Sequence, residues 1–138
     1  MILVDTTVVI DFLRNRSNPK SELFKRILAA EVQFGFSAFT MQEVLQGSKT
    51  PSEFLRMTNY FNAYPIIYPD QSSGTYICAA SLYADLRRVG VTIRNSMDTL
   101  IAATAIINDM PLLHNDRDFD AIAAKFPALR ILDPEGNC

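Results

Sequence analysis

The sequence contains no tryptophan, two cysteines and one histidine among its 138 residues. Cys78 and Cys138 do not have the spacing of a metal-binding or redox-active pair, so we expect reduced thiols. A single histidine, His114, gives little support to a Ser/His/Asp or Cys/His catalytic site, and we assign it no role. A glycine-rich phosphate loop is also missing. These absences leave acidic side chains as the main candidates for chemistry.

Long hydrophobic runs and an excess of basic charge are missing as well. The longest strongly apolar run, residues 99–107, falls far short of the roughly 20 residues that a membrane-spanning helix needs, so we expect no membrane insertion. Asp5 interrupts the first apolar run before it could act as a secretory signal, which predicts a cytoplasmic protein. The formal net charge of −2 offers no general attraction for nucleic acid, so a polyanionic substrate would need local help.

The order of apolar segments predicts a single α/β domain over residues 1–138. Hydrophobic residues make up 49% of the chain, and short apolar runs alternate with segments of helical periodicity. Because strands separated by helices need crossover connections, this order favours a mostly parallel five-stranded sheet covered on both faces. The expected strands are residues 2–4, 32–38, 65–68, 112–114 and 129–132. The expected helices are residues 8–14, 19–30, 41–47, a segment from Pro51, 75–90, 97–109 and 118–126.

Four acidic residues lie at the ends of these expected elements. Asp5 directly follows the first strand and Asp116 lies just beyond the fourth, whereas Glu43 and Asp98 lie in the first turns of helices. In parallel sheets, ligands gather beyond the carboxyl ends of the strands. An acid at the end of a buried strand also needs partners or a cation to offset its desolvation. We therefore expect these side chains to meet at one edge of the sheet.

Two of these acids have purely structural alternatives at helix starts. Thr40 and Glu43 have the spacing of a capping box, in which the glutamate bonds back to a backbone amide. Asp98 follows a possible Ser96 cap and could simply favour the positive end of its helix dipole. The sequence leaves both interpretations open.

The turn near residue 116 has structural alternatives too. Asn and Asp are common turn formers, so Asp116 could serve the turn alone. Asp118 could cap a helix that begins near Phe119, or it could pair with Arg117. These roles compete with metal binding as explanations of the same side chains.

Carboxylates that meet in one pocket repel each other. At about 4 Å, two of them repel by roughly 4 kcal/mol at an effective dielectric near 20. This approaches a domain's whole stability of roughly 5–15 kcal/mol. A cluster must therefore share protons, recruit a basic side chain or bind a metal, and oxygen ligands favour Mg²⁺ or Mn²⁺.

Four segments, in order, resemble those of a known family. VDTTVVIDFL, MQEVLQG, TIRNSMDTLIAATAI and PLLHNDRDFDAIA are similar to the successive motifs of VapC-type PIN-domain ribonuclease toxins. The resemblance covers nearly the whole chain, and no acid of the pattern is lost. It implies a PIN-domain-like three-layer α/β/α sandwich. It also implies a metal-dependent endoribonuclease toxin that cleaves RNA phosphodiester bonds with an activated water.

The resemblance also implies which residues form the site. Members commonly carry an aromatic residue in the first helix where this sequence has Val9, a difference outside the acidic pattern. The implied cofactor is Mg²⁺ or Mn²⁺. The implied catalytic and metal-binding residues are Asp5, Glu43, Asp98 and Asp116, with Thr7 and Asp118 as auxiliary residues.

Two protein partners are implied as well: a second copy of the chain in a homodimer, and a VapB-type antitoxin whose tail covers the acidic pocket. The apolar, aromatic-rich residues 54–68 could form a groove for the antitoxin, although core packing explains most of them. Arg87, Arg88 and Arg94 precede the Asp98 helix and could guide RNA, or could only complement a helix dipole.

Two other classes of function fit parts of the pattern. A phosphoacceptor signalling domain also places an aspartate at a strand end, but it expects a paired acid near the first strand and a basic residue beyond the last. The chain has Asp-Thr-Thr from residue 5 and Leu-Asp-Pro at residues 132–134, which disfavours this class. A non-catalytic interaction module would use its acids only as helix caps. It would show no metal-dependent shift in melting temperature.

Overall fold

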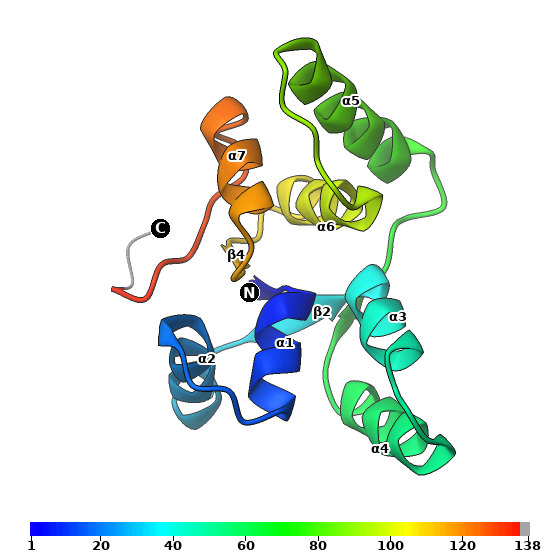
Figure 1. Cartoon of the computed structure of the whole chain (residues 1–138), viewed down its shortest axis with the longest axis vertical. Coiled ribbons are helices and arrows are strands. Elements are labelled where there is room, and N and C mark those ends of the chain that lie inside the picture. Colours follow the sequence, from blue (N-terminus) through cyan, green and yellow to red (C-terminus); the bar gives the residue numbers. More distant parts are fainter. Residues whose placement is uncertain (136–138) are drawn as a thin grey trace.

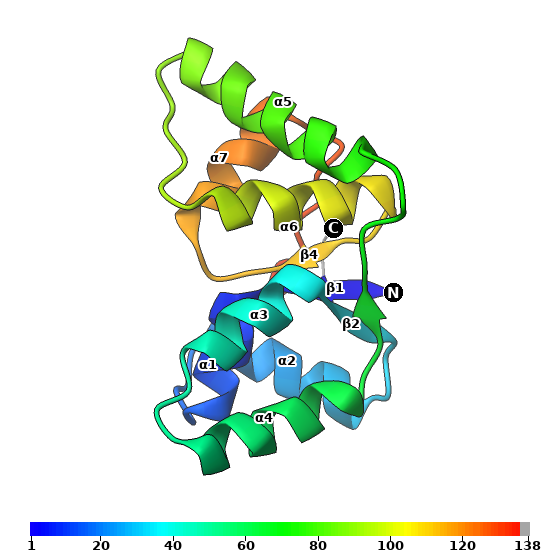
Figure 2. The same cartoon turned by 90° about the vertical axis from the view of Figure 1, so that its right-hand side faces the viewer.

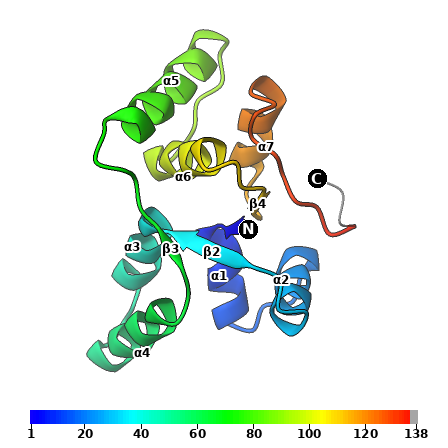
Figure 3. The same cartoon turned by 180° about the vertical axis from the view of Figure 1, so that it is seen from behind.

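The sheet at the centre of the protein has parallel strands in the order β3-β2-β1-β4. The structure is a computed structural model that describes residues 1–135, so Cys138 lies outside the described residues, and Cys78 is a free, half-buried thiol. Because the strands share one direction, their carboxyl ends lie at one edge of the sheet (Figure 3). The strands are β1 (Ile2–Val4), β2 (Phe34–Ser37), β3 (Ile66–Ile67) and β4 (Leu112–Leu113).

Helices cover both faces of this sheet, which confirms the predicted three-layer α/β/α sandwich (Figure 1 and Figure 2). One layer contains α1 (Thr6–Leu13), α2 (Pro19–Ala29), α3 (Ala38–Gln46) and α4 (Pro51–Asn62). The other layer contains α5 (Gly74–Arg88), α6 (Ser96–Ile107) and α7 (Arg117–Lys125). Within residues 1–135, no helix combines the length and the apolar character that crossing a bilayer requires.

The fifth strand predicted at residues 129–132 does not form, so that part of the prediction is wrong. Only one bridge, between Leu112 and Ile131, continues the sheet beyond β4 in the described residues. The amide of Leu112 donates to the carbonyl of Arg130 at 2.9 Å, and the amide of Leu132 donates to the carbonyl of Leu112 at 2.9 Å. β4 is only two residues long, and the prolines that flank the segment cannot donate to a ladder.

Neighbouring residues of β1 and β4 point into two separate cores. Leu3 and Leu112 pack on the side of α5, α6 and α7, whereas Val4 and Leu113 pack on the side of α1 to α4. All four side chains are fully buried. A parallel sheet covered on both faces therefore needs apolar residues at consecutive positions, and the uninterrupted run that ends at Val4 supplies them.

The core under α1 to α4 is aromatic. The Phe36 ring meets the Phe34 and Phe61 rings edge-on, with centroids 5.6 Å and 5.2 Å away. Phe24 also meets Phe34 edge-on, at 5.2 Å. Such contacts add to the stabilisation from burying the rings, and they join α2 and α4 to β2.

Three helices that begin at the carboxyl edge of the sheet start with the same kind of cap. Asp5 caps α1, Asn95 caps α6 and Asp116 caps α7. Each side-chain oxygen accepts a hydrogen bond of 3.0 Å from the backbone N–H two residues later. Asp and Asn cap as well as Ser or Thr, so a run of such residues does not identify the cap by itself. The caps considered for the last two of these helices, Ser96 and Asp118, are wrong by one and two residues.

Candidate metal centre

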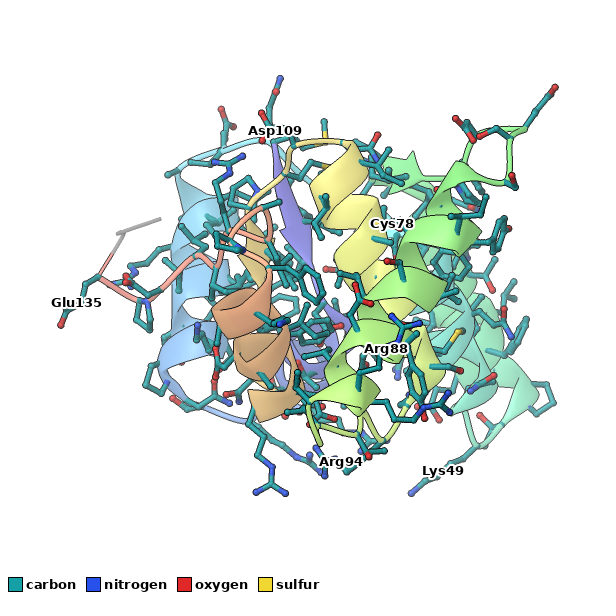
Figure 4. All side chains as sticks on the ribbon, turned by 90° about the horizontal axis from the view of Figure 1, so that it is seen from above. Lys49, Cys78, Arg88, Arg94, Asp109 and Glu135 are labelled. Atoms are coloured by element: carbon teal, nitrogen blue, oxygen red, sulfur yellow. The ribbon has the colours of Figure 1, made fainter. Side chains whose placement is uncertain are left out.

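A pocket of about 240 Å³ lies at the edge where β1 and β4 end. Its lining includes all four predicted acids, both predicted auxiliary residues and one of the three predicted arginines. Figure 4 shows the labelled Arg94 at this edge and Asp109, which precedes β4, at the opposite edge. The lining residues are Asp5, Thr6, Thr7, Glu43, Arg94, Asn95, Asp98, Asp116 and Asp118.

Asp5 is fixed at the end of β1 by Thr7. One carboxylate oxygen, Oδ2, accepts from the backbone N–H of Thr7 at 3.0 Å and from its hydroxyl at 2.6 Å. The Thr7 hydroxyl in turn accepts from the Asn115 backbone N–H at 3.0 Å, which ties Asp5 to the loop after β4. The other oxygen, Oδ1, is buried and has no hydrogen-bond partner among residues 1–135. Burial raises the pKa of Asp5 to about 6, although the Thr7 bonds oppose this shift.

Asp98 lies in the first turn of α6 and is only 7% exposed. No group among the described residues donates a hydrogen bond to its carboxylate. Burial and, after it, the negative charges of Asp5 and Asp116 together raise the pKa of Asp98 to about 7. A helix dipole alone would favour the ionised form of a first-turn acid. The dipole explanation therefore does not account for the state of Asp98.

Asp116 and Asp118 share one cation, the guanidinium of Arg94. Arg94 Nη2 donates to Asp116 Oδ1 at 3.1 Å, and Arg94 Nε donates to Asp118 Oδ2 at 3.2 Å. The hydrogen bond and charge of Asp118 raise the pKa of Arg94, and the charge of Asp116 adds to the shift. The alternatives in which Asp118 caps α7 or pairs with Arg117 are wrong, because Asp116 is the cap and Arg94 is the partner.

Glu43 is held by neutral donors. Thr6 Oγ1 donates to Glu43 Oε1 at 2.9 Å, and Asn95 Nδ2 donates to Glu43 Oε2 at 3.1 Å. The capping-box alternative is wrong, because α3 begins earlier than predicted and Ser37 is its cap. Glu43 therefore lies in the second turn of α3, with its carboxylate turned to the pocket rather than to its own backbone.

Sequence reasoning missed Thr6 and Asn95. Thr6 lies between Asp5 and Thr7, but only Thr7 was predicted as an auxiliary residue. Asn95 and Ser96 are both good capping residues before α6, so the sequence indicates a cap there without choosing between them. Asn95 also donates to Glu43, which lies 52 residues away in the chain. No local sequence pattern indicates this contact.

Three acids lie close enough together to share one cation. Carboxylate oxygens of Asp98, Asp116 and Asp118 all lie within 4.8 Å of one another. An octahedral Mg²⁺ binds its oxygens at about 2.0–2.1 Å, so ligand atoms on opposite sides are roughly 4 Å apart. The donor set and the unpartnered Oδ1 of Asp5 thus fit a hard divalent cation. Direct binding by Asp5 and Glu43 stays a prediction.

The predicted arginines separate into two groups. Arg94 lies in the pocket, but Arg87 and Arg88 lie at the end of α5 and do not line it. Arg88 pairs with Asp85, and Arg87 lies over the Tyr83 ring, 5.8 Å from its centroid. Figure 4 shows Arg88 on α5, apart from Arg94. Basic residues in the last turn of a helix complement its dipole, which is a sufficient reason for this pair.

His114 is a buried structural residue next to the site. Its Nδ1 accepts from the Asp116 backbone N–H at 3.0 Å, and its Nε2 lies 3.2 Å from Asp120 Oδ1. The imidazole also packs against the Phe119 ring, with centroids 5.1 Å apart. Burial lowers the pKa of His114, although Asp120 opposes the shift. Its contacts help to hold the loop that presents Asp116.

Residues 2–125 match the PIN domain family. The chain belongs to the PIN domain family. Curated relatives of this PIN domain include "VapC ribonuclease Mb1587" from Mycobacterium bovis and "Ribonuclease VapC11" from Mycobacterium tuberculosis. Each is 30% identical over 124 residues, which cover 89% of this chain and 92% of the relative. The predicted resemblance to VapC-type PIN domains is confirmed.

A solved structure has the same PIN fold. The chain resembles one in the crystal structure of DNA-bound VapBC from Salmonella typhimurium, with a TM-score of 0.74 and 21% sequence identity. The likeness covers 97% of this chain and 99% of that one. It therefore extends over the whole sandwich rather than over the acidic edge alone.

Proposed function

We propose that this PIN domain protein is a metal-dependent endoribonuclease of the VapC type, the toxin of a toxin–antitoxin pair that acts in the cytoplasm. The observation that carries the proposal is convergence: acids far apart in the chain line one pocket, and three of them have oxygens within 4.8 Å of one another. Relatives that are named VapC ribonucleases and match nearly full length support the same activity.

We assign each pocket residue a role from its contacts. Asp98, Asp116 and Asp118 would hold Mg²⁺ or Mn²⁺, and Asp5 offers its free Oδ1. Glu43, oriented by its two neutral donors, would complete the site through water. When bound, the cation would supply an activated water for attack on the RNA phosphodiester and would offset charge on the phosphoryl oxygens.

Charge gives the cation a second role. Five carboxylates and one guanidinium line the pocket, so the fully ionised site carries a net charge of −4. An RNA phosphate would be repelled by this charge, and the net charge of the whole chain, −2, does nothing to attract it. Divalent cations would cancel or halve the local charge. The same ion would therefore permit substrate entry and assist cleavage.

Asp98→Asn tests the activity. The variant should cleave total RNA from the expression host at least about 100-fold more slowly in Mn²⁺, because it loses a buried charge at the reacting phosphate. Sequencing the new RNA ends measures the cleavage and identifies the RNA that is cut. Asp109→Asn is the matched control, since Asp109 is an exposed carboxylate with a positive φ that Asn tolerates. Undiminished cleavage by folded Asp98→Asn would contradict the proposal.

Calorimetry separates this activity from a non-catalytic interaction module. We expect Mn²⁺ to raise the melting temperature of the wild-type protein, because an ion that binds only the folded state stabilises it. The Asp98→Asn variant should show a much smaller rise. An unchanged melting temperature for the wild type in millimolar Mn²⁺ would favour the interaction module.

We also propose that an antitoxin of the VapB type and a second copy of the chain are partners. An apolar groove of about 440 Å³ lies between α1, α3 and α4 and shares Glu43 with the acidic pocket. Met57 and Tyr60, from the predicted residues 54–68, line it. The buried Tyr60 hydroxyl has no hydrogen-bond partner in the described part of the chain. Structures named as VapBC complexes have the same fold. A chain segment in this groove could reach the acids directly.

Met57→Glu tests the groove. The wild-type chain, expressed in its native host, should co-purify with a small DNA-binding protein, and Met57→Glu should lose it because the new charge enters an apolar lining. Leu55→Glu is the control, since Leu55 is exposed on the same helix outside the groove. Recovery of no such partner with the wild type, or equal recovery with both variants, would contradict this site.

Light scattering of the purified chain tests the homodimer.

A further inference from the structure

We propose that Arg94 is a built-in counter-ion for Asp116 and Asp118 which a divalent cation must displace, so that Arg94 sets the affinity of the pocket for metal. This inference rests on the proposed function, because it requires a cation at the acidic triad. It makes metal binding an exchange of one cation for another rather than the filling of a free site.

The hydrogen bonds at Asp116 show why the two cations compete. Its Oδ1 accepts from the Asp118 backbone N–H at 3.0 Å and from Arg94 Nη2 at 3.1 Å. A carboxylate oxygen has two lone-pair sites, and both are in use. The Asp118 N–H belongs to the cap of α7 and stays with the helix. Coordination through Oδ1 therefore requires the Arg94 bond to break.

Asp118 is engaged in the same way. Its Oδ2 accepts from Arg94 Nε at 3.2 Å, so one guanidinium uses two different nitrogens to join two carboxylates. These are two of the three residues whose oxygens cluster for a cation. A guanidinium and a divalent ion held by the same two carboxylates would also repel each other. Simultaneous occupancy by both is thus disfavoured by geometry and by charge.

Arg94 is free to leave, whereas its partners are not. Its side chain is 62% exposed and comes from the loop between α5 and α6. The side chains of Asp116 and Asp118 are only 21% and 11% exposed and are fixed at the start of α7. An exposed guanidinium regains water when it is released, so its departure costs little. The carboxylates then remain in place for the incoming ion.

No other cation among residues 1–135 forms an ion pair with the triad. Arg88 pairs with Asp85 on the surface of α5, and Arg130 pairs with Asp109 at the opposite edge. This isolates Arg94 as the position to change. It also supplies Arg88 as a matched control of the same residue type.

Isothermal titration with Mn²⁺, without RNA, tests the exchange. We expect Arg94→Gln to bind Mn²⁺ at least about tenfold more tightly than the wild type, because the displaced charge is gone while a hydrogen-bonding side chain remains. Arg94→Lys keeps the charge without the two-nitrogen fork and should fall between the two. Arg88→Gln should leave the Kd unchanged. Metal-free Arg94→Gln should also melt lower and gain more from Mn²⁺, because the two carboxylates lose their counter-ion.

The outcomes distinguish this inference from the proposed function. An unchanged or weaker Kd for Arg94→Gln, with normal binding by the wild type, overturns the exchange but leaves the metal site intact. Binding by Arg94→Gln but not by the wild type supports the exchange. If neither protein binds Mn²⁺, the exchange and the metal-dependent nuclease fail together. Circular dichroism confirms that each variant is folded before titration.

Discussion

The two halves of the acidic pocket are held in different ways. In one half, neutral donors fix the carboxylates: Thr7 holds Asp5, and Thr6 and Asn95 hold Glu43. In the other half, the charged Arg94 fixes Asp116 and Asp118. Neutral donors orient a carboxylate and leave its charge for an incoming ion, whereas a guanidinium orients it and cancels part of that charge.

Asp98 lies between these halves and belongs to neither. It has no hydrogen-bond donor among the described residues, and it feels the charges of Asp5, Asp116 and Glu43. Its pKa is raised because, without a metal, this carboxylate is buried next to other negative charges. The protein's own groups therefore offset only part of the repulsion among these acids, and a bound cation would offset the rest.

The largest expected effect comes from removing the charge between the two halves. The folded pKa of Asp98 is about 7 against an ordinary 3.8, so its ionisation destabilises the metal-free fold as the pH rises from about 4 to 7. At pH 8, Asp98→Asn should therefore have a free energy of unfolding that is higher than that of the wild type by up to roughly 4 kcal/mol. The gain should shrink toward zero near pH 4. Urea denaturation across this range in a chelator measures it.

Asp109→Asn serves as the control for this pH series, because it makes the same substitution at an exposed carboxylate on the opposite edge of the sheet. A stabilisation by Asp98→Asn that is the same at pH 4 and pH 8 would contradict the role of charge. The pKa of Asp5 is about 6, so Asp5→Asn should also raise the free energy of unfolding at pH 8, by a smaller amount than Asp98→Asn.

A second effect comes from the neutral half. Thr7→Val removes the hydroxyl that donates to Asp5 and accepts from Asn115, which should lower the free energy of unfolding by roughly 1–3 kcal/mol. Thr7→Ser keeps the hydroxyl and should recover most of the loss. The same hydroxyl lowers the pKa of Asp5, so Thr7→Val should raise that pKa further. Urea denaturation at pH 8 compares the two variants, and equal stabilities would contradict the link.

A third, smaller effect separates the two uses of Asn95. Asn95→Ala removes both the cap of α6 and the donor to Glu43, and should cost about 1–2 kcal/mol. Asn95→Ser restores only the cap. The difference in unfolding free energy between Asn95→Ser and the wild type therefore measures the bond to Glu43. If serine restores nothing, capping is not the structural role of this residue.

The smallest effect is expected outside the pocket. Arg88→Gln removes an exposed ion pair with Asp85, which should change the free energy of unfolding by less than about 1 kcal/mol. RNA cleavage should be unchanged, because Arg88 does not line the pocket. A clear loss of cleavage would instead support the alternative in which this arginine guides RNA.

Much of the fold was predictable because its signals are local. The run before Asp5 predicts a buried strand, and helical periodicity predicts the helices within a few residues. The predicted strand at residues 129–132 was wrong because its neighbour, β4, is only two residues long. The apolar segment therefore pairs with β4 through a single bridge and does not form a strand. Caps were misplaced where several acceptors follow one another, as before α6.

The chain by itself determined which acids stand at the ends of strands and starts of helices, since those positions follow from periodicity and buried runs. Only the tertiary structure decided what each acid contacts. Arg94 reaches Asp116 and Asp118 across 22 and 24 residues, and Asn95 reaches Glu43 across 52. Such pairings depend on how α3, α6 and α7 pack around the end of β1. Hydrogen bonds and charges act over a few ångströms in space, so their partners are not written in the local sequence.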